Sequence, residues 1–147
     1  MRKRLLLIDD DIWANEKEAV PGAGAYMWYY ADALRDRGYV LTEVNSIDRA
    51  LEVLGIQQFD LILLDVMMPP GKALAEADTA AGMRTGVVFA DHLAKAYPDM
   101  PVVILTMVAN PSALNLLRNK PNVKEILYKI DNPPNWVAEA VGDILGE

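Results

Sequence analysis

The chain has 147 residues and no cysteine. The absence of thiols excludes disulfide bonds and thiolate catalysis, and it is typical of a reducing compartment. No apolar run approaches the roughly 20 residues that a membrane-spanning helix needs. The first apolar run, residues 5–8, leads into three aspartates rather than into the small-residue cleavage site of a signal peptide. We therefore expect a cytoplasmic protein that makes no contact with a membrane.

Positive charge is scarce, because 14 Lys and Arg face 21 Asp and Glu and the formal net charge is −7. The one basic run, Arg2 to Arg4, has only three residues and precedes an apolar stretch. A surface that binds nucleic acid needs a clustered basic patch. Direct contact with nucleic acid is therefore not expected.

Short apolar runs alternate with amphipathic segments along the whole chain. The predicted strands cover residues 4–8, 40–44, 61–64, 102–105 and 123–128, and the predicted helices cover 26–37, 47–54, 87–96, 111–118 and 134–145. Ser46 and Asn110 are suitable N-caps for the second and fourth helices. This alternation predicts an α/β fold with a parallel sheet and helices on both faces. The length fits one domain over residues 1–147.

Two predicted loops, residues 14–25 and 70–86, exceed the usual length of about 2–6 residues for a strand-to-helix loop. Both leave the sheet at the edge where the strands end. The 70–86 segment follows directly on Asp65 and Pro69. It could form a lid over Asp65 or a docking element for a partner, and the alternative is a mobile, solvated loop.

Polar side chains stand at the ends of four predicted strands. The aspartates at 9–11 follow the first strand, Asp65 the third, Thr106 the fourth and Lys129 the fifth. Singly, each could be a helix cap, a strand residue or a solvated charge. In an open α/β sheet, however, the carboxyl ends of the strands meet at the edge where ligands bind. Together these residues predict one functional site.

The chemistry of such a site follows from its charge. Crowded carboxylates repel one another and raise at least one pKa. Mg²⁺ relieves that repulsion and suits a site made of carboxylates, water and phosphate. A carboxylate at a strand end can attack phosphorus and form an acyl phosphate. An ammonium and a hydroxyl beside it, as at Lys129 and Thr106, could hold the phosphoryl oxygens.

The motifs LLLIDDD, DLILLDVMMP, VVILTM and ILYKI, in this order, resemble the receiver domain of two-component response regulators. The resemblance covers essentially the whole chain. It implies a flavodoxin-like, doubly wound sheet of five parallel strands in the order 2-1-3-4-5. It also implies a regulatory domain rather than an enzyme, with at most self-catalysed phosphorylation and dephosphorylation.

The same resemblance assigns roles to the site residues. Asp65 is implied as the phosphoacceptor, Thr106 as the switch hydroxyl and Lys129 as the ammonium that binds phosphate. Asp9 and Asp10 are the implied acidic pair for Mg²⁺. Asp10 and Asp65 would be direct metal ligands, and the backbone carbonyl of Met67 would be the third protein ligand.

A histidine kinase or a phosphotransfer protein is the implied phosphodonor. The output would then pass to a downstream protein through the fourth helix, the fifth strand and the fifth helix, and formation of a homodimer is left open. Two further functions remain as alternatives. A degenerate receiver would bind proteins without phosphorylation, and a small-molecule phosphatase would use Asp65 as its nucleophile. The phosphatase is disfavoured because Met67 stands where such enzymes carry a second acid.

Several positions depart from the family pattern. Ile130 follows the lysine where a proline is usual, and Met107 follows the threonine where a small residue is usual. The aromatic residue expected three positions before the lysine is replaced by Ile126. Tyr128 directly precedes the lysine, so its side chain is expected on the opposite face of the strand. This predicts that no aromatic side chain takes the usual switch position.

Overall fold

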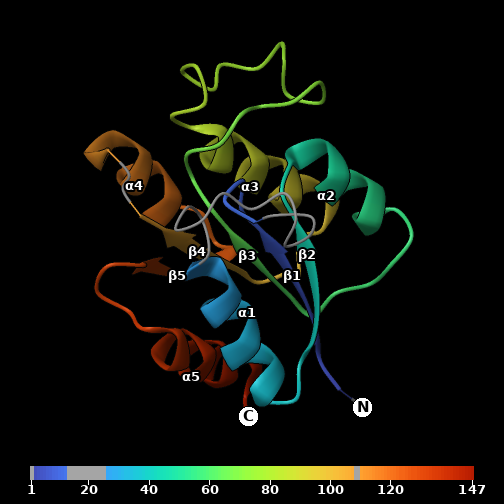
Figure 1. Ribbon diagram of the computed structural model, residues 1–147. Coiled ribbons are helices and arrows are strands. Elements are labelled where there is room, and N and C mark those ends of the chain that lie inside the picture. Colours follow the sequence, from blue (N-terminus) through green and yellow to red (C-terminus); the bar gives the residue numbers. More distant parts are fainter. Residues whose placement is uncertain (1, 13–25, 108–109) are drawn as a thin grey trace.

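The computed structural model describes residues 2–12, 26–107 and 110–147. Within these ranges five strands alternate with five helices (Figure 1). The strands are β1 (Arg4–Ile8), β2 (Val40–Val44), β3 (Leu61–Leu64), β4 (Val102–Thr106) and β5 (Val123–Tyr128). The helices are α1 (Tyr26–Asp36), α2 (Ile47–Leu54), α3 (Thr85–Ala96), α4 (Pro111–Arg118) and α5 (Pro134–Leu145).

The strands form one parallel sheet in the order β2-β1-β3-β4-β5. This confirms the predicted α/β fold and strand order. The predicted bounds differ from the observed ones only at element ends. β4 extends one residue further, to Thr106, α3 begins two residues earlier, at Thr85, and α1 ends one residue earlier, at Asp36. None of the helices in the described part of the chain is both long and apolar enough to span a bilayer.

Helices cover both faces of the sheet, with α1 and α5 on one face and α2, α3 and α4 on the other (Figure 1). The central strands β1, β3 and β4 are apolar except for Arg4 at the start of β1 and Thr106 at the end of β4. Successive side chains point to opposite faces, and both faces of these strands are buried. In β1, Leu6 and Ile8 pack with Phe89 of α3. Leu5 and Leu7 pack with the residues of α1 and α5. Two hydrophobic cores therefore hold the sheet between its helical layers.

Predicted capping residues begin two of the helices. The side chain of Ser46 accepts a hydrogen bond from the Arg49 amide at 3.1 Å, and that of Asn110 accepts one from the Ala113 amide at 2.7 Å. Each bond satisfies an amide that the first turn of the helix leaves without a backbone partner. The caps therefore fix the starting points of α2 and α4.

The 70–86 segment is attached to the fold at both ends. The carboxylate of Asp48, in α2, accepts hydrogen bonds from the amides of Lys72 at 2.9 Å and Ala73 at 2.8 Å. At the base of the segment, the Met68 amide donates to the Gly82 carbonyl at 3.2 Å. These hydrogen bonds connect the 70–86 segment to α2 and to the residues that follow β3. The 14–25 segment, which was also predicted to be an insertion, lies outside the described residues.

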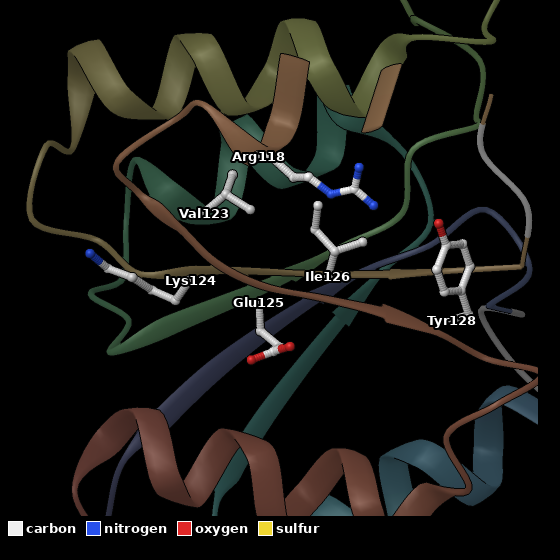
Figure 2. Close-up of a pocket in the computed structure, with 6 residues that line it drawn as sticks. All are labelled: Arg118, Val123, Lys124, Glu125, Ile126 and Tyr128. Carbon is white, nitrogen blue, oxygen red and sulfur yellow. The ribbon is translucent and has the colours of Figure 1, made fainter. Parts of the chain in front are cut away.

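The prediction for Tyr128 was wrong. Tyr128 and Ile126 lie on the same side of β5, facing α4, and Glu125 points the other way (Figure 2). Side chains two positions apart on a strand share a face, so an aromatic ring does accompany Ile126. With Arg118 of α4, these two residues line a groove of about 310 Å³ between α4 and β5.

Candidate functional site

The predicted site residues come together at the carboxyl edge of the sheet. Asp9 follows β1, Asp65 follows β3, Thr106 ends β4 and Lys129 follows β5. All four residues are buried, and Asp10 beside them is exposed. The strand register produces this arrangement, because parallel strands of similar length end at one edge.

The buried side chains form one network of hydrogen bonds and ion pairs. The Nζ of Lys129 lies 2.6 Å from Oδ2 of Asp9 and 3.7 Å from Oδ2 of Asp65. The hydroxyl of Thr106 donates to Oδ1 of Asp65 at 2.7 Å, and the amide of Val66 donates to the same oxygen at 2.7 Å. The Asp65 carboxylate is therefore fixed in orientation, with Oδ2 on the side of the ammonium.

The three carboxylates form a set that fits a divalent cation. Asp9, Asp10 and Asp65 each offer an oxygen, and these oxygens lie within 4.8 Å of one another. Oxygen ligands carrying negative charge are the donors that Mg²⁺ prefers. Met67 joins Asp10 and Asp65 in the lining of an open pocket of about 330 Å³ at this edge. No residue of the 70–86 segment is among the described residues that line this pocket, so its contacts do not support the predicted lid.

Burial and mutual repulsion perturb the carboxyl groups. Burial and the charge of Asp65 raise the pKa of Asp9 from 3.8 to about 7, against the attraction of Lys129. Burial also raises the pKa of Asp65, although Lys129 and the Thr106 hydroxyl oppose this shift. Burial lowers the pKa of Lys129, but the carboxylates of Asp9 and Asp65 outweigh it and the net shift is upward. The site therefore carries excess negative charge that a cation would stabilise.

These shifts predict how stability depends on pH. Because the pKa of Asp9 is higher in the folded than in the unfolded chain, the folded state binds more protons between about pH 4 and pH 7. Stability is then lost as the pH rises through this range. We expect the metal-free protein to lose about 2 kcal/mol of unfolding free energy between pH 5 and pH 8, relative to Asp9→Asn.

Urea unfolding in EDTA, at one-unit pH steps, measures this difference for the two proteins. Mg²⁺ competes with protons for the same oxygens, so it should stabilise the wild type more at pH 8 than at pH 5. Parallel pH profiles for the wild type and Asp9→Asn would contradict the prediction.

Tyr30 contributes to the site in a way that the sequence analysis missed. Its buried hydroxyl lies 3.0 Å from the carbonyl oxygen of Lys129 and 2.9 Å from that of Asn132. The hydroxyl thus connects α1 to the loop after Lys129, where exposed Ile130 replaces the usual proline. In the sequence Tyr30 was one of several aromatic residues in a row. No local pattern could connect it with a loop 99 positions later.

Comparison with known proteins agrees with this geometry. The sequence model of the family described as "Response regulator receiver domain" matches residues 25–131, a range that includes Asp65, Thr106 and Lys129. A search of curated protein sequences found no match to this chain.

Solved structures share the fold at low sequence identity. A CheY-like receiver domain protein from Methanospirillum hungatei is 19% identical, with a TM-score of 0.74 over 99% of this chain and 95% of that one. A putative response regulator from Chloroflexus aurantiacus is 19% identical, with a TM-score of 0.72 over 100% of both chains. The signal receiver domain of an HD domain-containing protein from Pseudomonas fluorescens is 17% identical, with a TM-score of 0.73 over 99% and 96%.

The family match covers well over half of the chain, and the strand order and the solved structures agree with it. The chain therefore belongs to the response regulator receiver domain family of two-component signalling.

Proposed function

We propose that this protein is a phosphoacceptor module of a two-component phosphorelay and that it receives a phosphoryl group on Asp65. The observation that carries the proposal is the fixed Asp65 carboxylate. Thr106 and Val66 donate hydrogen bonds to one of its oxygens, and the ammonium of Lys129 faces the other. Catalysis of phosphoryl transfer consists mainly of such positioning and charge neutralisation.

The phosphodonor is a histidine kinase or a phosphotransfer protein that carries phosphohistidine. An oxygen of the Asp65 carboxylate attacks the phosphorus, the O–P bond forms, and the N–P bond to imidazole breaks. In this proposal the Lys129 ammonium balances negative charge on the transferred phosphoryl oxygens, and the Thr106 hydroxyl donates a hydrogen bond to one of them. Asp9, Asp10, Asp65 and the carbonyl of Met67 would hold Mg²⁺, which supplies further neutralisation of the phosphoryl charge.

We place the output on the surface formed by α4, β5 and α5. The groove between α4 and β5 supports this placement, since its lining combines the apolar and aromatic side chains of Ile126 and Tyr128 with the charged side chain of Arg118 (Figure 2). In this proposal the protein acts by contacting a downstream protein rather than by turning over a free substrate.

The decisive experiment is phosphorylation with Mg²⁺ and a small phosphodonor such as phosphoramidate, followed by intact-mass measurement. We expect one added phosphoryl group on the wild type, none on Asp65→Asn and none with EDTA. Asp99→Asn is the matched control, because Asp99 is exposed at the opposite edge of the sheet and should leave the adduct unchanged. A wild type without an adduct would favour a degenerate receiver, and steady release of phosphate would favour a phosphatase.

A further inference from the structure

We propose that the 70–86 segment orients the backbone carbonyl of Met67 toward the Mg²⁺ site, and that Thr85 is a positioning residue for this carbonyl. The inference rests on the proposed function, because it assigns a task to residues around the same metal site. It replaces the lid predicted for this segment with a clamp, defined as the hydrogen bonds from residues 82–86 to residues 66 and 68.

The clamp holds the residues on both sides of Met67. The amide of Gly86 donates to the carbonyl of Val66 at 2.9 Å. The amide of Met68 donates to the carbonyl of Gly82 at 3.2 Å, and the hydroxyl of Thr85 donates to the carbonyl of Met68. Among the hydrogen bonds of the described residues, none uses the carbonyl of Met67. Within the described part of the chain, the neighbouring carbonyls are thus occupied and that of Met67 is left for a ligand.

The planarity of the peptide bond turns this clamp into an orienting device. The Met67 carbonyl and the Met68 amide belong to one peptide group, and they point in opposite directions because the bond is trans. Since the Met68 amide points at the Gly82 carbonyl, the Met67 carbonyl must point away from Gly82. Met67 lines the pocket with Asp10 and Asp65. The clamp therefore fixes the direction of the third predicted protein ligand.

Thr85 supplies the clamp's side-chain contact. Thr85 is 0% exposed and Met68 is buried, so water is a poor alternative partner for the hydroxyl and for the Met68 carbonyl. Removing the hydroxyl while keeping the shape, as in Thr85→Val, leaves a buried carbonyl without a donor. The segment 66–68 can relieve that cost by moving toward solvent, and the Met67 carbonyl then loses its orientation.

Mg²⁺ affinity measured by isothermal titration calorimetry tests the inference. We expect Thr85→Val to weaken binding about tenfold, the lower end of the loss that follows removal of a partner of a metal ligand. Thr85→Ser keeps the hydroxyl and should bind like the wild type. Thr85→Ala provides a second variant without the hydroxyl in case valine prevents folding.

Asp48→Ala is the matched control for a general effect on the 70–86 segment. It removes the attachment to Lys72 and Ala73 but does not touch residues 66–68 or the clamp, so Mg²⁺ affinity should stay at the wild-type value. Equal affinity of the wild type and folded Thr85→Val would overturn the inference while leaving the proposed function intact. Equal losses in Asp48→Ala and Thr85→Val would also overturn it. A wild type that binds no Mg²⁺ would refute the metal site itself and the inference with it.

Discussion

Replacing Gly86 with alanine should destabilise the protein by about 3 kcal/mol, near the upper end of the costs of overfilling a packed site. A Cβ atom at this position would lie 2.6 Å from Cα of Val66 and closer still to the carbonyl oxygen of Asp65. Both neighbours are backbone atoms, which cannot turn aside as a flexible side chain could. Urea unfolding of the two proteins measures the loss.

Gly142→Ala is the matched control, because Gly142 is also buried within a helix. A Cβ at Gly142 would meet its nearest atoms, the side-chain ends of Arg37 and Tyr39, at 3.5 Å, an ordinary contact. Alanine favours a helix interior over glycine by about 1 kcal/mol, so this control should be neutral or stabilising. If Gly86→Ala were as stable as the wild type, the close approach of α3 to the end of β3 would be refuted.

Lys129→Met is expected to cost about 3–5 kcal/mol at pH 8, the range observed when one partner of a buried ion pair is removed. The side chain of Lys129 is only 2% exposed, and its ammonium lies beside the carboxylates of Asp9 and Asp65. Without it, two buried negative charges lose their counter-charge. At pH 5 the raised pKa of Asp9 leaves that group protonated, so the cost should be much smaller.

Lys120→Met is a strict control for this effect. Lys120 pairs with Asp91 at the same 2.6 Å distance, but Asp91 is exposed. Exposed ion pairs contribute about 0–1 kcal/mol, so unfolding free energies should fall by no more than that at either pH. Equal costs for the two substitutions, or a cost at Lys129 that does not change with pH, would contradict the coupling of Lys129 to the buried carboxylates.

Most of the fold could be predicted because its signals are local. The apolar run of β3 at Leu61–Leu64 and the caps at Ser46 and Asn110 each depend on a few neighbouring residues. Strand–helix alternation then restricts the topology, since parallel strands need crossover helices. The order of the strands came from the family resemblance, and the structure confirms it.

Part of the site followed from the same logic, because parallel strands bring their carboxyl ends to one edge. This principle predicted that Asp9, Asp65, Thr106 and Lys129 lie close together. In the structure they form ion pairs and a hydrogen bond with one another. The partners that support these residues could not be predicted. Tyr30 contacts the carbonyl of Lys129 from α1, and Thr85, at the start of α3, contacts the carbonyl of Met68. Contacts of this kind depend on tertiary packing, which leaves no periodic pattern in the sequence.

The error at Tyr128 has a different origin, because the strand itself was correctly predicted. Tyr128 does alternate with Lys129, but the switch position is that of Ile126, which lies two residues from Tyr128 and therefore shares its face. An aromatic ring therefore lies on the α4 side of β5, in the groove that Arg118 also lines. When a residue departs from a family pattern, the comparison should therefore include the other residues on the same face of the strand and not only the aligned position.

The hydrogen bond between Met68 and Gly82 also bears on how the chain length at this place can change in evolution. It closes residues 69–81 into a loop whose two ends meet beside β3, so residues can be added or lost within the loop without moving its ends. The entropic cost of a longer closed loop grows only slowly with its length. The length of this loop can thus vary without moving the residues at the carboxyl edge of the sheet. A receiver domain can therefore acquire a long segment next to its candidate site.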